Sequence, residues 1–113
     1  MDEIRIGLVG LGHRGVGWLH LLQRVRGYRI TAICDPIIPL HERALSVISY
    51  RSEVKAYRRF EEVLADPNVD AIALTVRCKE QGAMAAQALE AGKHVNMEVP
   101  AAHTMEDCWR IVA

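Results

Sequence analysis

Residues 4–35 read IRIGLVGLGHRGVGWLHLLQRVRGYRITAICD, and this stretch decides the fold. A short apolar run over 4–9 leads into the glycine-rich segment GLGHRG at 10–15. A helical spacing of apolar residues follows, and a second apolar run over 28–34 is closed by Asp35. Strand, glycine turn, helix, strand and acid in this order predict one complete βαβ unit.

The glycines of this segment have the spacing GxGxxG, in which each glycine has its own physical role. Gly10 permits the tight turn off the strand, Gly12 lets a pyrophosphate approach the backbone, and Gly15 lets the helix pack closely on the strands. The helix then begins with free backbone N–H groups and a partial positive charge, which both favour a phosphate. Asp35 lies about 20 residues beyond Gly15, where the motif places a carboxylate on the adenosine ribose. The segment therefore predicts a dinucleotide site.

The composition argues against several other classes of function. The chain has 113 residues, which suggests one domain, and its 14 Lys and Arg balance its 14 Asp and Glu. A net charge of zero gives no electrostatic reason to expect binding to nucleic acid or to an anionic membrane surface. No apolar run is long enough to cross a membrane, and Asp2 and Glu3 stand where a signal peptide would be basic. We therefore expect neither a nucleic-acid partner nor a membrane.

The spacing of cysteines and histidines predicts no metal site. The cysteines lie far apart without a CxxC pair, and the histidines show neither HxxxH nor HExxH spacing. Such cysteines are typical of reduced thiols, so the expected location is the cytoplasm. The residues concerned are Cys34, Cys78, Cys108, His13, His20, His41, His94 and His103.

Strand and helix patterns alternate along the whole chain. The expected strands cover 4–9, 28–34, 55–57, 71–76 and 94–97, and the expected helices cover 14–26, 39–49, 60–65, 81–91 and a last segment from Thr104. In the first helix, the side chains expected to face the sheet are Trp18, Leu21, Leu22 and Val25. Such alternation predicts an α/β fold with a doubly wound parallel sheet and helices on both faces, the Rossmann fold.

The last predicted helix carries an unusual apolar face. Met105, Cys108, Trp109 and Val112 share this face, and the sequence stops at Ala113 without a helix cap. We therefore expect either that the chain is the front part of a longer protein, or that partner surface covers this edge.

Residues 91–100, AGKHVNMEVP, resemble the AGKHV…EKP signature of the Gfo/Idh/MocA oxidoreductases, the family of glucose–fructose oxidoreductase and inositol dehydrogenase. The glycine segment 10–15, Asp35 and the phrase DPNVDA at 66–71 fall in the matching order. The resemblance covers residues 1–113 but only the first, NAD-binding domain of that family. It implies a second domain, absent from this chain, that supplies most contacts to a sugar or polyol substrate. It also implies a possible homo-oligomer.

The same resemblance implies NAD in a crevice at the carboxyl ends of the strands. The loop backbone would hold the pyrophosphate, Asp35 the adenosine ribose, and Glu98 would lie near the nicotinamide ribose. Residues 75–77 would lie beside the cofactor, where the family often has Thr-Pro-Asn. Asp35 favours NAD over NADP, because a 2′-phosphate would meet its carboxylate. The candidate cofactor-binding residues are Gly10, Leu11, Gly12, His13, Arg14, Gly15, Asp35, Thr75, Val76, Arg77 and Glu98.

Two departures from the family pattern leave the catalytic residues unknown. Val99 replaces the lysine of EKP, which commonly assists hydride transfer, and Gln81 stands roughly where the family often has a histidine. The run EVPAA at 98–102 is similar to a branch that contains NAD-dependent glycosidases of the α-N-acetylgalactosaminidase type. The main prediction is an NAD-dependent oxidoreductase domain, which alone would not turn over substrate. The alternatives are an NAD-dependent glycosidase with transient redox chemistry and a stand-alone NAD-binding module.

Several polar side chains have two interpretations. His13 can contact a phosphate or the substrate, or can point to solvent while its backbone N–H binds. Arg14 can pair with the pyrophosphate, or can be an exposed arginine at the start of the helix. His94 is expected in a buried strand, as a core or hydrogen-bonded residue rather than a catalytic one. His103 follows the EVP turn and can contact substrate, whereas Thr104 more simply caps the last helix.

Overall fold

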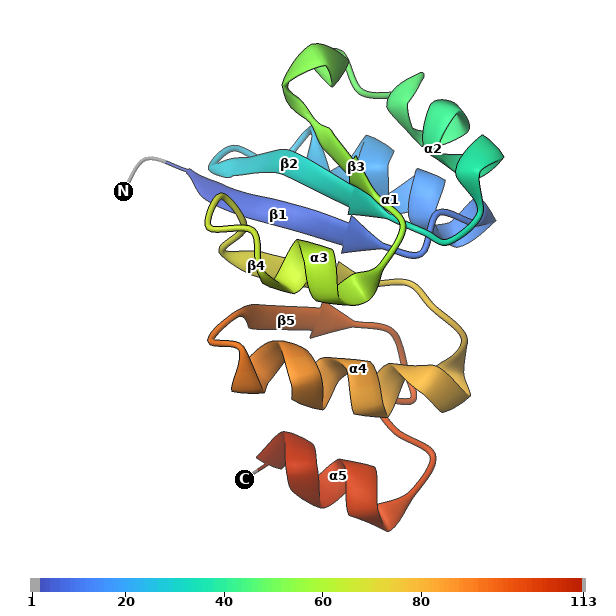
Figure 1. The fold of residues 1–113 in the computed structure, drawn as a ribbon, viewed down its shortest axis with the longest axis vertical. Coiled ribbons are helices and arrows are strands. Elements are labelled where there is room, and N and C mark those ends of the chain that lie inside the picture. Colours follow the sequence, from blue (N-terminus) through green and yellow to red (C-terminus); the bar gives the residue numbers. More distant parts are fainter. Residues whose placement is uncertain (1–2, 113) are drawn as a thin grey trace.

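Five parallel strands form one sheet in the computed structural model, which describes residues 3–112 (Figure 1). The sheet order is β3-β2-β1-β4-β5. The strands are β1 (Ile4–Val9), β2 (Tyr28–Cys34), β3 (Lys55–Tyr57), β4 (Ala71–Leu74) and β5 (His94–Met97). The helices are α1 (His13–Leu22), α2 (Ile38–Leu45), α3 (Phe60–Leu64), α4 (Cys78–Glu90) and α5 (Met105–Val112), with a short 3₁₀ turn at Arg51–Glu53.

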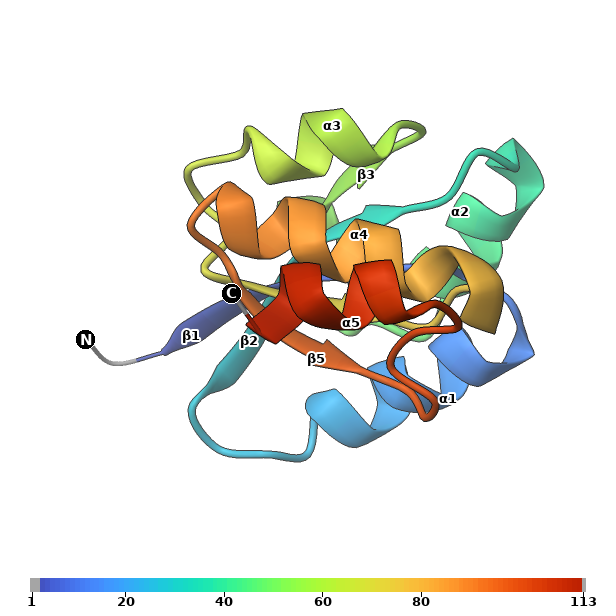
Figure 2. The same cartoon turned by 90° about the horizontal axis from the view of Figure 1, so that it is seen from below.

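Two helices cover each face of this sheet. α1 and α2 pack on one face through Leu19, Leu22 and Ala44, whereas α3 and α4 pack on the other through Val63 and Ala85. α5 packs against α4 and so lies outside the sheet layers (Figure 2). The expected doubly wound α/β fold is therefore confirmed.

β1 is the centre of the sheet and of the core. It pairs with β2 and β4, so that Leu8 lies between Ile33 and Ala73 and is fully buried. A strand that is buried on both faces has apolar residues at nearly every position. The apolar runs 4–9 and 28–34 could therefore be predicted as strands from the sequence. Because all five strands are parallel, their carboxyl ends meet at one edge of the sheet.

Ionic contacts hold the opposite edge, where the strands begin. The guanidinium of Arg5 donates to both carboxylate oxygens of Asp70, at 3.0 and 2.9 Å, and ties β1 to the residue before β4. This guanidinium lowers the pKa of Asp70 to about 2. Nζ of Lys93 donates to the carbonyl oxygens of Asp66 and Val69, at 2.9 and 2.6 Å. The lysine of the AGKHV phrase therefore fastens the turn before β4 to β5.

The first helix is shorter than expected. α1 ends at Leu22 rather than near residue 26, because the chain tightens there into turns in which Arg24 and Val25 donate to the carbonyls of Leu21 and Leu22. Leu21 and Val25 are consequently exposed, at 59% and 46% of their surface, and the expectation that they face the sheet is wrong.

Other element boundaries also differ from the expected ones. Leu19 takes one of the inward positions of α1, with Trp18 partly buried beside it. β4 ends at Leu74, which leaves Thr75 and Val76 in the connection to α4. α4 begins at Cys78 rather than at residue 81.

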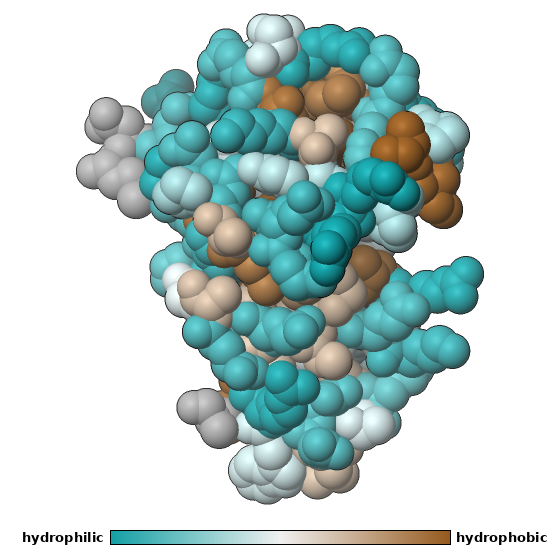
Figure 3. Space-filling model, viewed as in Figure 1, coloured by the Kyte–Doolittle hydropathy of each residue, from teal (hydrophilic) through white to brown (hydrophobic). Residues whose placement is uncertain are grey.

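The face of the molecule seen in Figure 3 is mostly hydrophilic, with small apolar patches. Ile37 and Ile38, where α2 begins, are about half exposed, at 55% and 50%. The apolar face of α5 is open as well, since Met105, Trp109 and Val112 expose 71%, 65% and 75% of their surface. The expectation that the chain continues beyond this helix, or that partner surface covers its apolar face, stays a prediction.

None of the helices in the described part of the chain is long and apolar enough to cross a membrane. The cytoplasmic location expected from the cysteines stays a prediction.

Candidate functional site

A cavity of about 470 Å³ lies at the carboxyl ends of β1, β2 and β4. Six of the residues predicted to bind the cofactor line it, namely Gly10, Gly12, Asp35, Thr75, Val76 and Arg77. The sheet order explains this meeting, because β1 lies between β2 and β4 and the chain leaves all three strands at the same edge.

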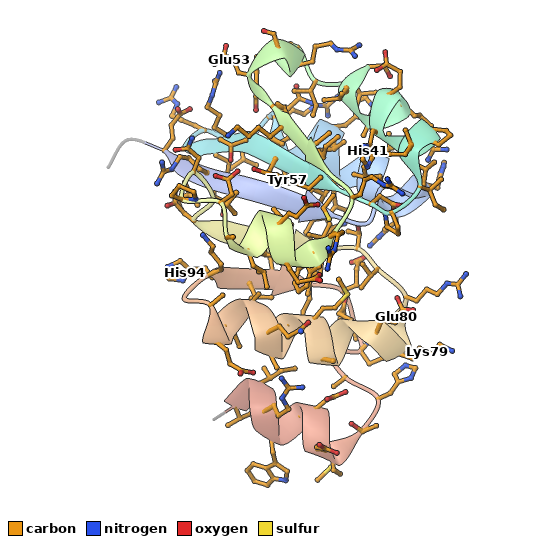
Figure 4. All side chains as sticks on the ribbon, in the orientation of Figure 1. His41, Glu53, Tyr57, Lys79, Glu80 and His94 are labelled. Carbon is orange, nitrogen blue, oxygen red and sulfur yellow. The ribbon has the colours of Figure 1, made fainter. Side chains whose placement is uncertain are left out.

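A larger cavity, of about 790 Å³, lies where the strands begin, at the other end of the sheet. Asp70, Lys93 and His94 are among its lining residues. It contains none of the residues predicted to bind the cofactor. His94 is exposed at the start of β5 and lies at the far end of the sheet from Glu80 (Figure 4). The expectation that His94 belongs to the core is therefore wrong.

The glycine segment is fastened to β4 by short contacts. Gly10 has a φ of +95°, which favours glycine, and a Cβ on it would lie 2.6 Å from the carbonyl oxygen of Thr75. The hydroxyl of Thr75 donates to the carbonyl oxygen of Gly10 at 2.7 Å. A Cβ on Gly15 would lie 2.0 Å from that same Gly10 oxygen. The first and third glycines are therefore required by the packing of the protein itself.

Gly12 is different, because nothing in the protein requires a glycine there. Its backbone has φ −71° and ψ −168°, an extended conformation open to any residue. A Cβ built on it would meet no atom within 4 Å. Gly12 is also the N-cap of α1, and the first backbone N–H groups of a helix have no intrahelical acceptor. An open space beside unpaired N–H donors is suited to an anion.

Asp35 is buried where β2 ends, with 9% of its surface exposed. One carboxylate oxygen accepts the backbone N–H of Leu11 at 2.9 Å, and the other accepts the N–H of Ile37 at 2.8 Å. Each oxygen keeps a lone pair for a further donor, such as a ribose hydroxyl. Because the Leu11 N–H is used in this way, the loop donors left for a phosphate are those of Gly12, His13 and Arg14.

Arg14 and Glu98 form an ion pair between the start of α1 and the residue after β5. Nη2 of Arg14 lies 3.2 Å from Oε1 of Glu98, and Nε contacts the other oxygen. The hydrogen bond from Arg14 lowers the pKa of Glu98, so the carboxylate is ionised at neutral pH. Neither residue lines the 470 Å³ cavity. The pair instead bridges the glycine loop and the end of β5.

Gln81 is fully buried on α4 and holds the segment after β5. Its amide nitrogen donates to the carbonyl oxygens of Glu98 and Pro100, at 2.6 and 2.9 Å. Its amide oxygen accepts the N–H of Glu98 at 3.1 Å. Val99 projects from this segment and is 91% exposed. The sequence shows Gln81 only as a replacement for a histidine, whereas the structure makes it the support of Glu98.

Replacing Gln81 with leucine is expected to loosen residues 98–100, because three hydrogen bonds of this loop end on that amide. We expect the free energy of unfolding to fall by about 1–3 kcal/mol, measured by urea denaturation. Gln87→Leu is the matched control, because it makes the same change on the exposed side of α4, where the stability should hardly alter. A Gln81→Leu protein as stable as the wild type would contradict the assigned role.

Sequence reasoning missed the other residues that line the cavity, namely Val9, Cys34, Pro36, Leu40, Arg58, Phe60, Glu80 and Met84. Arg58 directly follows β3, so the rule that ligands bind at the carboxyl ends of parallel strands could have found it. Cys34 also lines the cavity, but burial raises the pKa of its thiol to about 12, which leaves it unreactive at neutral pH.

Comparison with known proteins agrees with this geometry. The family model described as an oxidoreductase family with an NAD-binding Rossmann fold, Gfo/Idh/MocA, matches residues 4–113. Among curated proteins, a protein named glycosyl hydrolase family 109 protein 2, from Shewanella sp. strain ANA-3, is 38% identical over 99% of this chain and 26% of its own length. A family 109 protein from Shewanella amazonensis is 35% identical with the same coverage. The chain therefore spans about a quarter of the length of these relatives.

Solved structures share the fold along nearly the whole chain. An NAD-binding protein from Listeria innocua is 30% identical, with a TM-score of 0.85 over 97% of this chain and 31% of that one. The WlbA dehydrogenase from Chromobacterium violaceum, crystallised with NADH and UDP-GlcNAcA, is 24% identical, with a TM-score of 0.85 over 99% and 32%. A scyllo-inositol dehydrogenase from Lactobacillus casei, with bound NAD(H) and scyllo-inositol, is 21% identical, with a TM-score of 0.81 over 96% and 32%. The last two likenesses show the fold.

Proposed function

This chain belongs to the Gfo/Idh/MocA oxidoreductase family as its NAD-binding Rossmann domain, and from that premise we propose which of its residues bind NAD. The backbone N–H groups of residues 12–14 take the pyrophosphate, and Asp35 takes the hydroxyls of the adenosine ribose. Residues 75–77 border the adenosine, and Glu98 lies toward the nicotinamide ribose. Leu11 contributes by holding Asp35 in place, as Gly10 and Gly15 do by letting the loop pack on β4. Bound NAD would supply the hydride acceptor.

The observation that carries this proposal is the open space beside Gly12. Packing explains the glycines at 10 and 15, but neither packing nor backbone conformation explains the one at 12. That space adjoins a cavity with a buried carboxylate, Asp35, whose oxygens each have a lone pair to spare. A phosphate on the amides and a ribose on the carboxylate fit both features.

Gly12→Ala tests the proposal. We expect the variant to lose at most about 1 kcal/mol of stability, because its new methyl meets no atom of the protein and alanine is only a poorer N-cap than glycine. We also expect NAD affinity, measured by calorimetry, to fall roughly ten-fold or more, because the methyl occupies the approach of the pyrophosphate. Gly17→Ala is the control, since a Cβ there is equally free of contacts but lies on α1 away from the cavity. Unchanged NAD affinity in Gly12→Ala would reject this pyrophosphate site.

For the whole protein, we propose hydride transfer to or from a sugar or polyol. Residues 1–113 would provide the NAD-binding domain, and a further domain would bind the substrate and could also form a homo-oligomer. This is supported by the curated relatives, of whose length the chain covers 26%. It is also supported by the solved relatives that carry a sugar nucleotide or an inositol. Within the described residues, no pair of groups is identified as acid and base.

A second candidate is an NAD-dependent glycosidase with transient redox chemistry. It is favoured by Val99, because valine can neither carry a charge nor relay a proton where the family commonly has lysine. It is also favoured by relatives named as glycosyl hydrolases. The whole protein would then cleave a glycoside with no net NADH, since the hydride taken from the sugar is returned to it. NADH that accumulates in step with product would reject this candidate.

A further inference from the structure

Two arginines at the candidate site have no partner within the described structure. Every ion pair found among the described residues uses an arginine, as in Arg14 with Glu98 and Arg59 with Glu61. Arg58 and Arg77 line the 470 Å³ cavity, yet neither makes a hydrogen bond or an ion pair with any described side chain. Both side chains are exposed, and Arg24, Arg26 and Arg43 also lack a partner among the described residues, so it is the shared position of Arg58 and Arg77 on one cavity that suggests a planar or anionic ligand.

The sheet places these arginines on opposite sides of Asp35. Cys34 pairs with Tyr57 in the sheet, and the Asp35 N–H donates to the Tyr57 carbonyl at 3.1 Å, so Arg58 follows β3 directly beside Asp35. Arg77 comes from the other side, as the N-cap of α4 after β4. A group bound to the Asp35 carboxylate would therefore have one guanidinium on each flank.

The wall between the two arginines is largely apolar. Phe60 from α3 and Met84 from α4 line it together with Val76. Such a wall suits a flat ring better than it suits a phosphate, which needs several donors. The molecule already contains one guanidinium stacked on a ring, because Arg29 lies 4.0 Å from the centroid of the Tyr50 ring.

We propose that Arg58 and Arg77 clasp the adenine ring of the dinucleotide, with their guanidinium groups against its faces or edges. This inference rests on the proposed NAD site. The adenine is joined to the ribose carbon next to the 2′-hydroxyl, so a ribose held by Asp35 places the ring beside Asp35, between the two arginines. Guanidinium groups stack on nucleobases through their planar cation, and they gain most where water is excluded.

Calorimetry with AMP, NAD and nicotinamide mononucleotide tests this clasp. We expect Arg58→Ala and Arg77→Ala to weaken AMP and NAD roughly five- to thirty-fold, and to leave nicotinamide mononucleotide unchanged because it lacks adenine. Arg58→Lys keeps the charge but not the plane, so we expect it to stay weakened. Arg24→Ala is the control, since Arg24 is exposed and does not line the cavity. The decrease in adenine absorbance that stacking causes should shrink in both alanine variants.

Three results would overturn the clasp. In the first, the wild type binds NAD and the alanine variants bind it equally well. In the second, Arg58→Lys restores wild-type affinity for AMP, which would indicate a charge contact rather than stacking. In the third, the loss is confined to NADP, which would assign Arg58 to a 2′-phosphate. If the wild type binds neither NAD nor AMP, the proposed function fails, and the clasp fails with it.

Discussion

Gly15→Ala is expected to lower the free energy of unfolding by roughly 2–4 kcal/mol, a large fraction of the stability of a domain of this size. The new Cβ would lie 2.0 Å from the Gly10 carbonyl oxygen and 3.0 Å from the Thr75 hydroxyl. The first of these atoms is backbone in a loop that is itself fixed on β4, so it cannot move aside cheaply. α1 must therefore shift away from β1 and lose part of its packing. Urea denaturation of the variant beside the wild type measures the loss.

Gly17→Ala is the matched control for this prediction. It makes the same chemical change within the same helix, but its Cβ meets no atom within 4 Å. Alanine also restricts the unfolded chain more than glycine does, so we expect a gain of about 0.5–1 kcal/mol. Gly15→Ala should thus lower the free energy of unfolding, whereas Gly17→Ala should raise it. If Gly15→Ala were as stable as Gly17→Ala, the close approach of α1 to the glycine loop would be wrong.

Asp35→Ala is expected to reduce NAD affinity by roughly a hundred-fold or more. The carboxylate would accept two ribose hydroxyls, and hydrogen bonds to a charged group contribute about 1.5–3 kcal/mol each. The change also removes the repulsion that a 2′-phosphate would meet, so the preference for NAD over NADP should narrow or reverse. Calorimetry with NAD and NADP on both proteins measures the two effects together.

A control must separate binding from stability, because Asp35 also accepts the N–H groups of Leu11 and Ile37. Tyr50→Phe serves this purpose. The Tyr50 hydroxyl accepts the Ile30 N–H at 2.9 Å, so its loss removes one neutral hydrogen bond of a backbone N–H, a smaller loss than in Asp35→Ala, without touching the cavity. We expect Tyr50→Phe to bind NAD like the wild type. Equal affinity of the wild type for NAD and NADP, or no change in Asp35→Ala, would contradict the ribose assignment.

The parts of the fold that could be predicted are those that depend on the spacing of apolar residues and glycines within a short stretch of sequence. Buried parallel strands such as β1 and β2 are apolar on both faces, so they stand out in the sequence, and the glycine spacing fixes the turn between β1 and α1. The end of α1 could not be predicted in this way. Leu21 and Val25 continue the helical spacing, but hydrogen bonds from the Gln23 amide to the carbonyls of Leu19 and Val47 hold the chain at the turn.

Some residues of the candidate site could likewise be predicted from the sequence, and others could not. Gly10, Gly12 and Asp35 could be placed together because a single motif contains all of them. Gln81 and Arg58 could not be assigned, since their roles depend on pairing between segments that are distant in sequence. Gln81 contacts residues beyond β5, and Arg58 reaches the cavity only because β3 pairs with β2. Sequence spacing carries no information about such contacts unless the topology is known.

The central position of β1 affects the order in which the chain can fold. β1 can pair with β2 as soon as the first βαβ unit exists, but its other neighbour, β4, begins only at Ala71. The hydroxyl of Thr75, which holds Gly10, comes later still. Contacts between segments far apart in the chain require the closure of a long loop and therefore slow folding. During synthesis, the glycine turn is thus complete only after Thr75 has emerged.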